Sequence, residues 1–243
     1  MKQSIFTIKE NIALTESVYK MTLSGDTGDI TKSGQFVNIK IDGMFLRRPI
    51  SVCDSENGIL TLIYKVVGEG TEAMKNMEAG KELDILTGLG NGYDLSKSGD
   101  TPMLLGGGVG VPPMYMLCKK LIEMGKKVKV VLGFNTKDEI FYEDEFRALG
   151  AEVTVTTVDG SYGTKGFVTD VMANADYSYF YTCGPEPMLK AIHKCSVTSG
   201  QFSFEERMGC GFGACMGCSC KTVTGYKRIC KEGPVLEKEE ILW

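Results

Sequence analysis

The chain of 243 residues is 43% hydrophobic and carries 27 basic against 31 acidic side chains, a net charge of −4. This length accommodates one large domain or two modest ones. The charges are scattered and form no basic stripe, so we expect no nucleic-acid partner. Glycines and prolines interrupt the most apolar window, residues 103–118, and the N-terminus lacks the apolar run of a signal peptide. We therefore expect a cytoplasmic protein that does not bind membranes.

The first 97 residues predict a β-rich domain. Short runs of β-forming residues are separated by turns, a pattern typical of an antiparallel barrel or sandwich. The polar, glycine-containing stretch 90–100 is interpreted as a boundary loop. The expected strands are Gln3–Ile8, Val18–Leu23, Gln35–Ile41, Ile59–Val67 and Leu83–Leu86.

Residues 98–199 alternate between predicted strands and helices, which indicates an α/β domain built on a parallel sheet. The alternation stops after residue 199, so residues 200–243 are expected to form a small separate module. The expected strands are Thr101–Leu105, Lys127–Leu132, Glu152–Val158 and Tyr177–Thr182, and the expected helices are Pro113–Met124, Glu143–Leu149, Val168–Ala173 and Pro187–Val197.

Five of the nine cysteines lie between residues 210 and 230. Four of them follow the spacing Cys210-x4-Cys215-x2-Cys218, then eleven residues, then Cys230. This is the plant-type arrangement for a 2Fe-2S cluster, which is held by four thiolates. Glycines at 209, 211, 213 and 217 allow the backbone to turn closely around the irons. The sequence therefore predicts a cluster bound by these four cysteines.

Alternatives remain open for the cysteine-rich segment. A structural zinc site usually has two C-x2-C pairs, and only one is present. Cys220 competes with Cys230 as the fourth ligand, although it lies only two residues from Cys218. The remaining cysteines with apolar or helical neighbours are expected to be small buried hydrophobes, namely Cys53, Cys118 and Cys195.

A glycine-rich turn follows the predicted strand Thr101–Leu105 and precedes a helix, where backbone amides accommodate a pyrophosphate. A second loop, Cys183-Gly184-Pro185, also lies between a strand and a helix. Ligands bind at the carboxyl edge of a parallel sheet, so the two loops together predict a dinucleotide site. The turn contains Gly106, Gly107, Gly108 and Gly110, with Pro113 where a Rossmann motif has its third glycine.

Asp159 follows the predicted strand Glu152–Val158 at the same edge of the sheet. An acidic residue beside the adenosine ribose repels a 2′-phosphate, which favours NAD over NADP. The alternative is an ordinary turn residue before Gly160.

These motifs, in their order along the chain, resemble the ferredoxin-NADP reductase superfamily. Within it, the cysteine spacing and the ending Tyr226-Lys-Arg-Ile-Cys230-Lys-Glu-Gly-Pro-Val are similar to the electron transfer subunits of NAD-dependent (type B) dihydroorotate dehydrogenase. The resemblance implies an antiparallel FAD-binding barrel (1–97), an NAD-binding domain (98–199) and a 2Fe-2S module (200–243). The motifs are Arg48-Pro49-Ile50-Ser51, Gly70-Thr71, the 106–113 turn, Cys183-Gly184-Pro185 and the cysteine loop.

The resemblance also assigns individual residues. Arg48 and Ser51 match an R-x-x-S motif in which the arginine faces the FAD pyrophosphate and the serine faces the isoalloxazine ring. Ile50 stands where many of these reductases have an aromatic residue. Considered alone, Arg47 and Arg48 would be surface charges, although a guanidinium fork suits a phosphate. Further matches are Ile63, Tyr64, Lys65, Gly70 and Thr71 near the flavin and Cys183 near the nicotinamide.

The implied function is electron transfer in de novo pyrimidine (UMP) biosynthesis. A flavin links two-electron transfer at NAD to one-electron transfer at a cluster. Electrons would pass from an FMN-containing catalytic subunit, which binds dihydroorotate, through the 2Fe-2S cluster and FAD to NAD. The assembly would be a heterotetramer, with Phe212 and Met216 facing the partner. No acid–base residue is needed, so His193 is expected on a helix surface.

Other functions remain open. One is the FAD and 2Fe-2S subunit of an NADH-dependent ferredoxin-NADP oxidoreductase or of a sulfide dehydrogenase. Another is a zinc-stabilised binding module without catalytic activity.

Overall fold

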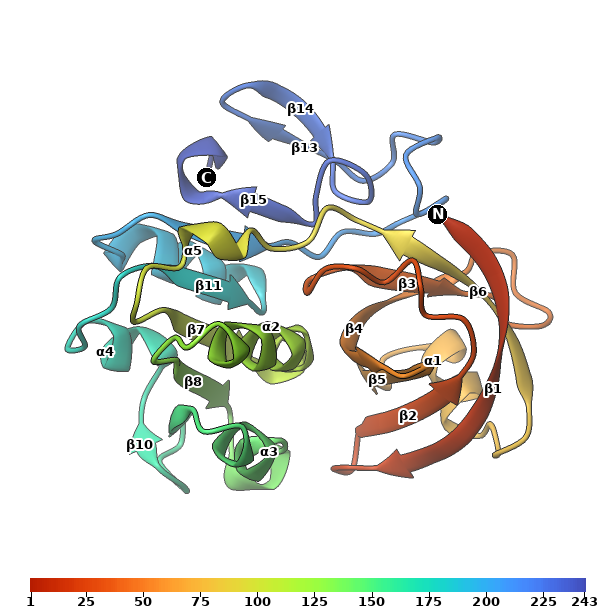
Figure 1. Ribbon diagram of the computed structural model, residues 1–243, viewed down its shortest axis with the longest axis horizontal. Helices are drawn as coiled ribbons and strands as arrows, with labels where there is room; N and C mark the ends of the chain where they lie inside the picture. Colours follow the sequence, from red (N-terminus) through yellow and green to blue (C-terminus); the bar gives the residue numbers. More distant parts are fainter.

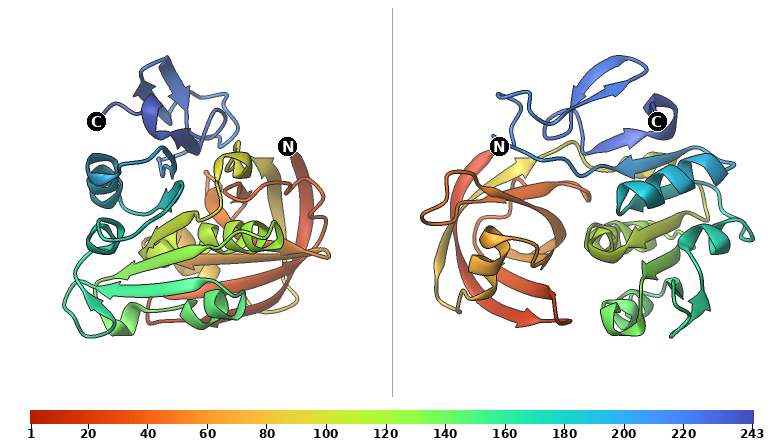
Figure 2. Two further views of the ribbon diagram at one scale, coloured as in Figure 1. Left: turned by 60° about the vertical axis from the view of Figure 1, so that its left-hand side comes forward. Right: turned by 180° about the vertical axis from the view of Figure 1, so that it is seen from behind.

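The computed structural model describes all 243 residues. A barrel and a helix-covered sheet lie side by side, and the C-terminal segment lies across the top of both (Figures 1 and 2). This arrangement confirms the predicted fold class of an antiparallel barrel followed by an α/β domain.

The barrel is closed and antiparallel, with the strand order β1-β2-β5-β4-β3-β6. Inward-facing apolar side chains alternate with outward-facing ones, so Phe6 and Ile8 of β1 are fully buried in its core. β4 and the helix α1 were not predicted, because β4 contains arginine, proline and acidic residues in place of an apolar pattern. The bounds are β1 Lys2–Ala13, β2 Val18–Ser24, β3 Phe36–Ile39, β4 Arg48–Glu56, β5 Ile59–Lys65, β6 Glu82–Leu89 and α1 Glu69–Lys75.

The second part is a seven-stranded sheet in the order β10-β9-β8-β7-β11-β12-β15. All neighbouring strands are parallel except β12 and β15. Its strands are β7 Met103–Gly107, β8 Lys129–Phe134, β9 Glu152–Thr157, β10 Thr164–Lys165, β11 Phe180–Cys183, β12 Gly200–Ser203 and β15 Val235–Glu237. The longer helices are α2 Pro112–Glu123, α3 Glu143–Ala148, α4 Val168–Met172 and α5 Glu186–Cys195, and the single turns of 3-10 helix are η1 Leu95–Lys97, η2 Gly108–Gly110, η3 Lys137–Glu139 and η4 Lys238–Glu240.

The C-terminal segment is tied into this sheet. β12 and β15 both lie beyond residue 199, and the hairpin of β13 (Ser219–Thr222) and β14 (Gly225–Arg228) lies between them in the sequence. The seven-stranded sheet therefore continues past residue 199. The predicted boundary at this residue, between the NAD-binding domain and the 2Fe-2S module, stays a prediction.

The expected environments of several single residues were only partly right. Cys53 and Cys118 are buried, as expected, whereas Cys195 is exposed because α5 ends there. His193 is half-buried on α5 and its ring contacts that of Trp243, so it is not a free surface residue. Every helix in the structure is too short or too polar to cross a membrane.

One hydrophobic core joins the barrel to the sheet. Cys53 of β4 and Ile63 of β5 belong to the same buried cluster as Leu117 and Leu121 of α2. At the edge of this contact, Lys119 of α2 forms salt bridges with two barrel carboxylates, Asp54 at 3.3 Å and Glu56 at 2.6 Å. The core fixes the barrel against the sheet.

The shared core predicts unequal effects of two neighbouring substitutions on α2. Leu117→Ala removes a fully buried side chain and should lower the free energy of unfolding by about 2–5 kcal/mol. Lys119→Ala removes a partly exposed ion pair and should cost less than about 1 kcal/mol. Urea denaturation of both variants measures the difference, and equal losses would show that the ion pairs, not the core, join the two parts.

Candidate dinucleotide and cluster sites

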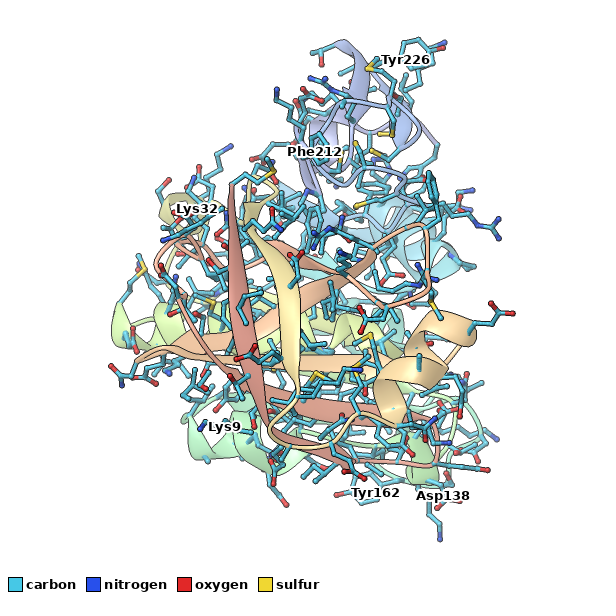
Figure 3. All side chains as sticks on the ribbon, turned by 90° about the vertical axis from the view of Figure 1, so that its right-hand side faces the viewer. Lys9, Lys32, Asp138, Tyr162, Phe212 and Tyr226 are labelled. Atoms are coloured by element: carbon cyan, nitrogen blue, oxygen red, sulfur yellow. The ribbon has the colours of Figure 1, made fainter.

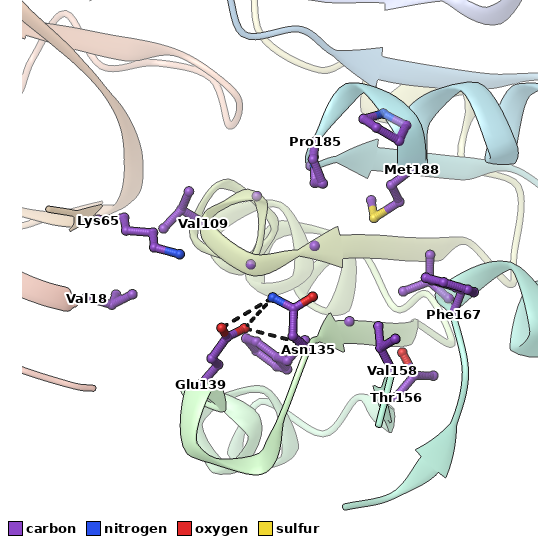
Figure 4. A pocket seen from close by; sticks show the side chains of 18 of the residues that line it. Val18, Lys65, Val109, Asn135, Glu139, Thr156, Val158, Phe167, Pro185 and Met188 are labelled. Atoms are coloured by element: carbon purple, nitrogen blue, oxygen red, sulfur yellow. Dashed lines mark hydrogen bonds between the residues drawn. The ribbon is translucent and has the colours of Figure 1, made fainter. Parts of the chain in front are cut away.

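A cavity of about 550 Å³ opens between the barrel and the carboxyl edge of the parallel sheet. Figure 4 shows Lys65 and Val18 on the barrel side, with Pro185 and Met188 on the sheet side. The carboxyl edge of such a sheet is where nucleotides bind. The cavity therefore has the position and size of a cofactor cleft.

The glycine-rich turn and the Cys183-Gly184-Pro185 loop form one wall of this cavity. Gly106 and Cys183 are register partners on the adjacent strands β7 and β11. A Cβ atom on Gly110 would lie 2.2 Å from the carbonyl oxygen of Cys183, so no other residue fits at this backbone contact. Gly107, Gly108 and Gly110 line the cavity, whereas Gly106 and Pro113 are buried behind it.

Cys183 itself is buried and is not part of the cavity wall. Burial raises the pKa of its thiol well above the usual range, so the group is a neutral thiol. Its neighbours Gly184 and Pro185 do line the cavity. The contact between Cys183 and nicotinamide stays a prediction.

Asp159 follows the cavity-lining residue Val158 but does not itself line the cavity. Its carboxylate accepts hydrogen bonds from the amide and the hydroxyl of Ser161, at 2.9 and 2.7 Å, and these hydrogen bonds lower its pKa. This is the geometry of the turn alternative. The preceding residue, Val158, is the one that lines the cavity, so the role of Asp159 in NAD preference stays a prediction.

Two acidic residues that do line the cavity were missed in the sequence. Glu139 is held by the backbone and side-chain nitrogens of Asn135, as drawn in Figure 4. Glu205 follows β12, and loss of hydration raises the pKa of its carboxyl. Glu205 is exposed and lines the cavity, so its carboxyl is accessible to a bound ligand. Neither residue belongs to a local motif, so only the fold brings them to the site.

The predicted flavin residues are divided between two environments. Lys65 lines the cavity, while Ile63 is buried in the core shared with α2. The Tyr64 hydroxyl donates to the Asn11 side chain at 2.9 Å, inside the barrel. The Tyr64 side chain is therefore not accessible to a ligand. Ile50 packs against the barrel core, and it forms no aromatic platform.

Arg48, Gly70 and Thr71 meet at the start of β4. A Cβ on Gly70 would lie 1.9 Å from Nε of Arg48, so glycine is required for the arginine to lie there. The Thr71 hydroxyl accepts from the amides of Val67 and Gly68 at 2.9 and 3.3 Å, so it stabilises the turn and is not free for a ligand. The approach of Arg48 to this turn provides a cationic site that suits a phosphate.

The four predicted ligand cysteines form two pairs. The side chains of Cys210 and Cys215 form a hydrogen bond that lowers the pKa of Cys210. The side chains of Cys230 and Cys218 form another, which raises the pKa of Cys230. The structure contains no group of three or more His, Cys, Asp or Glu side chains arranged to hold one metal ion. Two pairs suit a 2Fe-2S cluster, in which two protein ligands bind each iron, better than a tetrahedral zinc.

Backbone amides also point at these sulfurs. The amides of Ala214 and Cys215 donate to Sγ of Cys210 at 3.2 and 3.5 Å. Burial opposes ionisation of Cys210, but the amide hydrogen bonds outweigh it and lower the pKa of this thiol to about 6. Burial raises the pKa of Cys230 to about 12. Cys220 makes no hydrogen bond with the four cysteines, so the geometry favours Cys230 as the fourth ligand.

The cysteine loop contacts the barrel directly. The Asn38 side chain on β3 donates to the Cys210 carbonyl at 3.2 Å. In the same loop, Phe212 and Met216 are 42% and 56% exposed. Figure 3 shows both Phe212 and Tyr226 in the C-terminal segment, with Tyr226 at its outer tip. The loop is therefore hydrogen-bonded to the barrel at Cys210, and it also carries apolar side chains that the rest of the chain leaves exposed.

Comparisons with known proteins agree with this geometry. Residues 205–242 match the family model of the iron-sulfur cluster binding domain of dihydroorotate dehydrogenase B, and residues 104–194 match that of an oxidoreductase NAD-binding domain. The chain is 46% identical to the dihydroorotate dehydrogenase B (NAD(+)) electron transfer subunit of Fusobacterium nucleatum, over 97% of this chain and 96% of that one. The subunit of Bacillus pumilus is 44% identical, over 99% and 98%.

The chain belongs to this family of electron transfer subunits. Membership confirms the resemblance found in the motifs and makes the chain an oxidoreductase subunit, so the zinc-stabilised binding module is wrong. A solved structure of an NADH-dependent reduced ferredoxin-NADP oxidoreductase is also similar, with a TM-score of 0.90 and 29% identity over 98% of this chain and 90% of that one. The flavohemoglobin of Malassezia yamatoensis shares the fold, with a TM-score of 0.69 and 19% identity over 80% and 56%.

Gly110 provides a direct test of the cavity wall. Gly110→Ala places a methyl group against the backbone of Cys183 and forces the two loops apart. We expect NADH binding to weaken about tenfold or more, because the dinucleotide wall is displaced. Isothermal titration with NADH measures this effect. Gly125→Ala is the matched control, since its Cβ would meet nothing within 4 Å, although its positive φ adds local strain. Equal NADH affinity in wild type and Gly110→Ala would contradict the assignment.

Glu205 should make stability depend weakly on pH, because its side chain is exposed and solvent screens the effect. Its pKa is higher in the folded chain than the ordinary value of 4.5, so the folded state binds more protons and loses stability as the pH rises above that value. Glu205→Gln has no titrating carboxyl at this position, so it should not lose stability in this way as the pH rises. The variant should gain thermal stability relative to wild type at pH 7.5 but not at pH 4.5, as measured by melting temperature. A difference that is the same at both pH values would show that the pKa of Glu205 is not raised in the folded chain.

Proposed function

We propose that this chain is the electron transfer subunit of a dihydroorotate dehydrogenase B, and that it connects an FMN-containing catalytic subunit to NAD in pyrimidine biosynthesis. The observation that carries the proposal is the position of the barrel. It forms one wall of the dinucleotide cavity through Lys65, and it holds the cysteine loop through Asn38. A flavin bound to the barrel would therefore have NAD on one side and the cluster on the other.

Three groups of residues would hold the cofactors. Arg48, approaching Gly70, would bind the FAD pyrophosphate, and Ser51 would face the isoalloxazine ring. The 107–110 turn and Gly184-Pro185 would bind NAD, and the two cysteine pairs would bind the 2Fe-2S cluster. When bound, FAD exchanges a hydride with nicotinamide and single electrons with the cluster. These groups divide the chain into functional units at about residues 97 and 199.

The chain's own residues position the cofactors and exclude water; they do not transfer protons in this scheme. The buried neutral Cys183 supports the floor of the cavity, and the shared core behind Ile63 keeps the barrel at a fixed distance from the sheet. Ligation by free thiolates requires reduced cysteines, which supports a cytoplasmic location. We propose a heterotetramer with two copies of each subunit, in which the exposed face around Phe212 and Met216 contacts the partner.

The experiment that tests this function is anaerobic reduction of NAD by dihydroorotate. It compares the purified chain alone, the FMN-type subunit alone and the mixture. Activity in the mixture only supports the proposal. A mixture that is inactive although both proteins carry their cofactors would shift the function to the NADH-dependent ferredoxin-NADP oxidoreductase type, whose solved structure the fold also resembles.

Two cysteine variants test the cluster. Cys215→Ser should abolish iron-sulfur absorption and NAD reduction in the mixture, because one iron loses a ligand, while NADH oxidation with a two-electron dye stays within about twofold. Cys220→Ser is the matched control and should keep the cluster, since Cys220 lies outside the two pairs. Iron analysis and visible spectra measure both. Loss of the cluster in Cys220→Ser with retention in Cys230→Ser would reverse the choice of the fourth ligand.

A further inference from the structure

The turn between β3 and β4 presents a phenylalanine that the rest of the chain leaves uncovered. Phe45 is 100% exposed, and its neighbour Leu46 is 43% exposed. The turn projects from the barrel on the side away from the parallel sheet (Figure 1). The NAD-binding part of the chain therefore does not cover this ring.

The backbone on both sides of Phe45 is firmly held. Before it, Met44 packs on the barrel core, and its amide donates to the Ile41 carbonyl at 3.1 Å. After it, the Arg47 guanidinium forms a two-pronged salt bridge with Asp84, with each nitrogen to oxygen distance at 3.0 Å. A ring that a fixed turn holds outward is preorganised for binding, because little conformational freedom is lost when a ligand covers it.

The same turn holds Arg48. Nη1 of Arg48 donates to the Leu46 carbonyl at 2.5 Å, and Nη2 contacts the Met44 sulfur at 3.0 Å. The stem of the guanidinium lies against Gly70. The residues on either side of Phe45 therefore fix the group that is proposed to bind the FAD pyrophosphate.

The direction of β4 places Phe45 at one end of the proposed flavin site. Ser51 and Arg48 are three residues apart on this strand, about 10 Å. FAD has the covalent order isoalloxazine, ribityl chain, pyrophosphate, ribose and adenine. With the isoalloxazine ring at Ser51 and the pyrophosphate at Arg48, the adenosine continues past Arg48 toward the start of β4. The 44–46 turn lies in that direction.

We propose that Phe45 stacks on the adenine ring of FAD, an inference that rests on the proposed FAD site at Arg48. A purine has a flat π face, and stacking on an aromatic side chain needs no hydrogen-bond partner. FMN ends at its single phosphate and has no adenine. Phe45 is thus the residue through which the barrel selects FAD over the FMN that its partner uses.

The test uses the full-length chain freed of flavin and titrated with FAD and with FMN, with binding followed by flavin fluorescence. Phe45→Ala should weaken FAD binding about tenfold and leave FMN binding unchanged, because only FAD loses the stacking contact. Phe45→Trp should restore FAD affinity. Tyr226→Ala, which removes another exposed ring, is the matched control and should change neither affinity.

Three results overturn the inference. Wild-type FAD affinity in Phe45→Ala shows that the ring does not contact FAD, and an equal loss of FAD and FMN affinity shows that the turn only supports Arg48. Unchanged FAD affinity with failure to co-elute with the FMN-type subunit assigns the ring to the subunit interface. If the wild-type chain binds neither flavin, the proposed FAD site fails, and that result is distinct from a failure of Phe45 alone.

Discussion

The packing of the barrel on α2 is the constraint on which the rest of the structure depends. Cys53 and Ile63 on the outside of the barrel share one buried core with Leu117 and Leu121. Because this contact is apolar and closely packed, it allows little sliding or rotation between the two parts. The cavity on one side of the contact therefore has a fixed width, and hydride transfer needs such fixed geometry at short range.

The cysteine loop depends on a different kind of contact. Its link to the barrel is polar and local, through the Asn38 side chain and the Cys210 carbonyl, and the hydrogen bond is partly buried. Burial raises the pKa of Cys230, whereas two loop amides donate to the Cys210 sulfur and lower the pKa of that thiol. Negative charge on sulfur is the state that iron requires, so the protein favours the ligand form of this thiol before metal arrives.

The sequence was informative where the chemistry is local. The cysteine spacing, the glycine turn and the loop at Cys183 each lie within a short segment, and the structure places all of them at strand ends or in loops. Prediction failed where burial depends on distant partners. β4 has a polar sequence because Asp54, near one end, forms a salt bridge with Lys119, and Arg48, at the other end, lies against Gly70. Glu205 reaches the cavity only because β12 lies beside β11, a pairing that no local pattern indicates.

The pairing of β12 with β15 has a consequence for biogenesis. These strands flank the whole cysteine-bearing segment, and they are held to each other by antiparallel pairing within the main sheet. The two ends of the segment are thus already fixed when the sheet forms, which removes much of the entropic cost of closing the loop around iron. The pairing of β12 with β15, and not iron binding, therefore brings the two ends of the cysteine-bearing segment together.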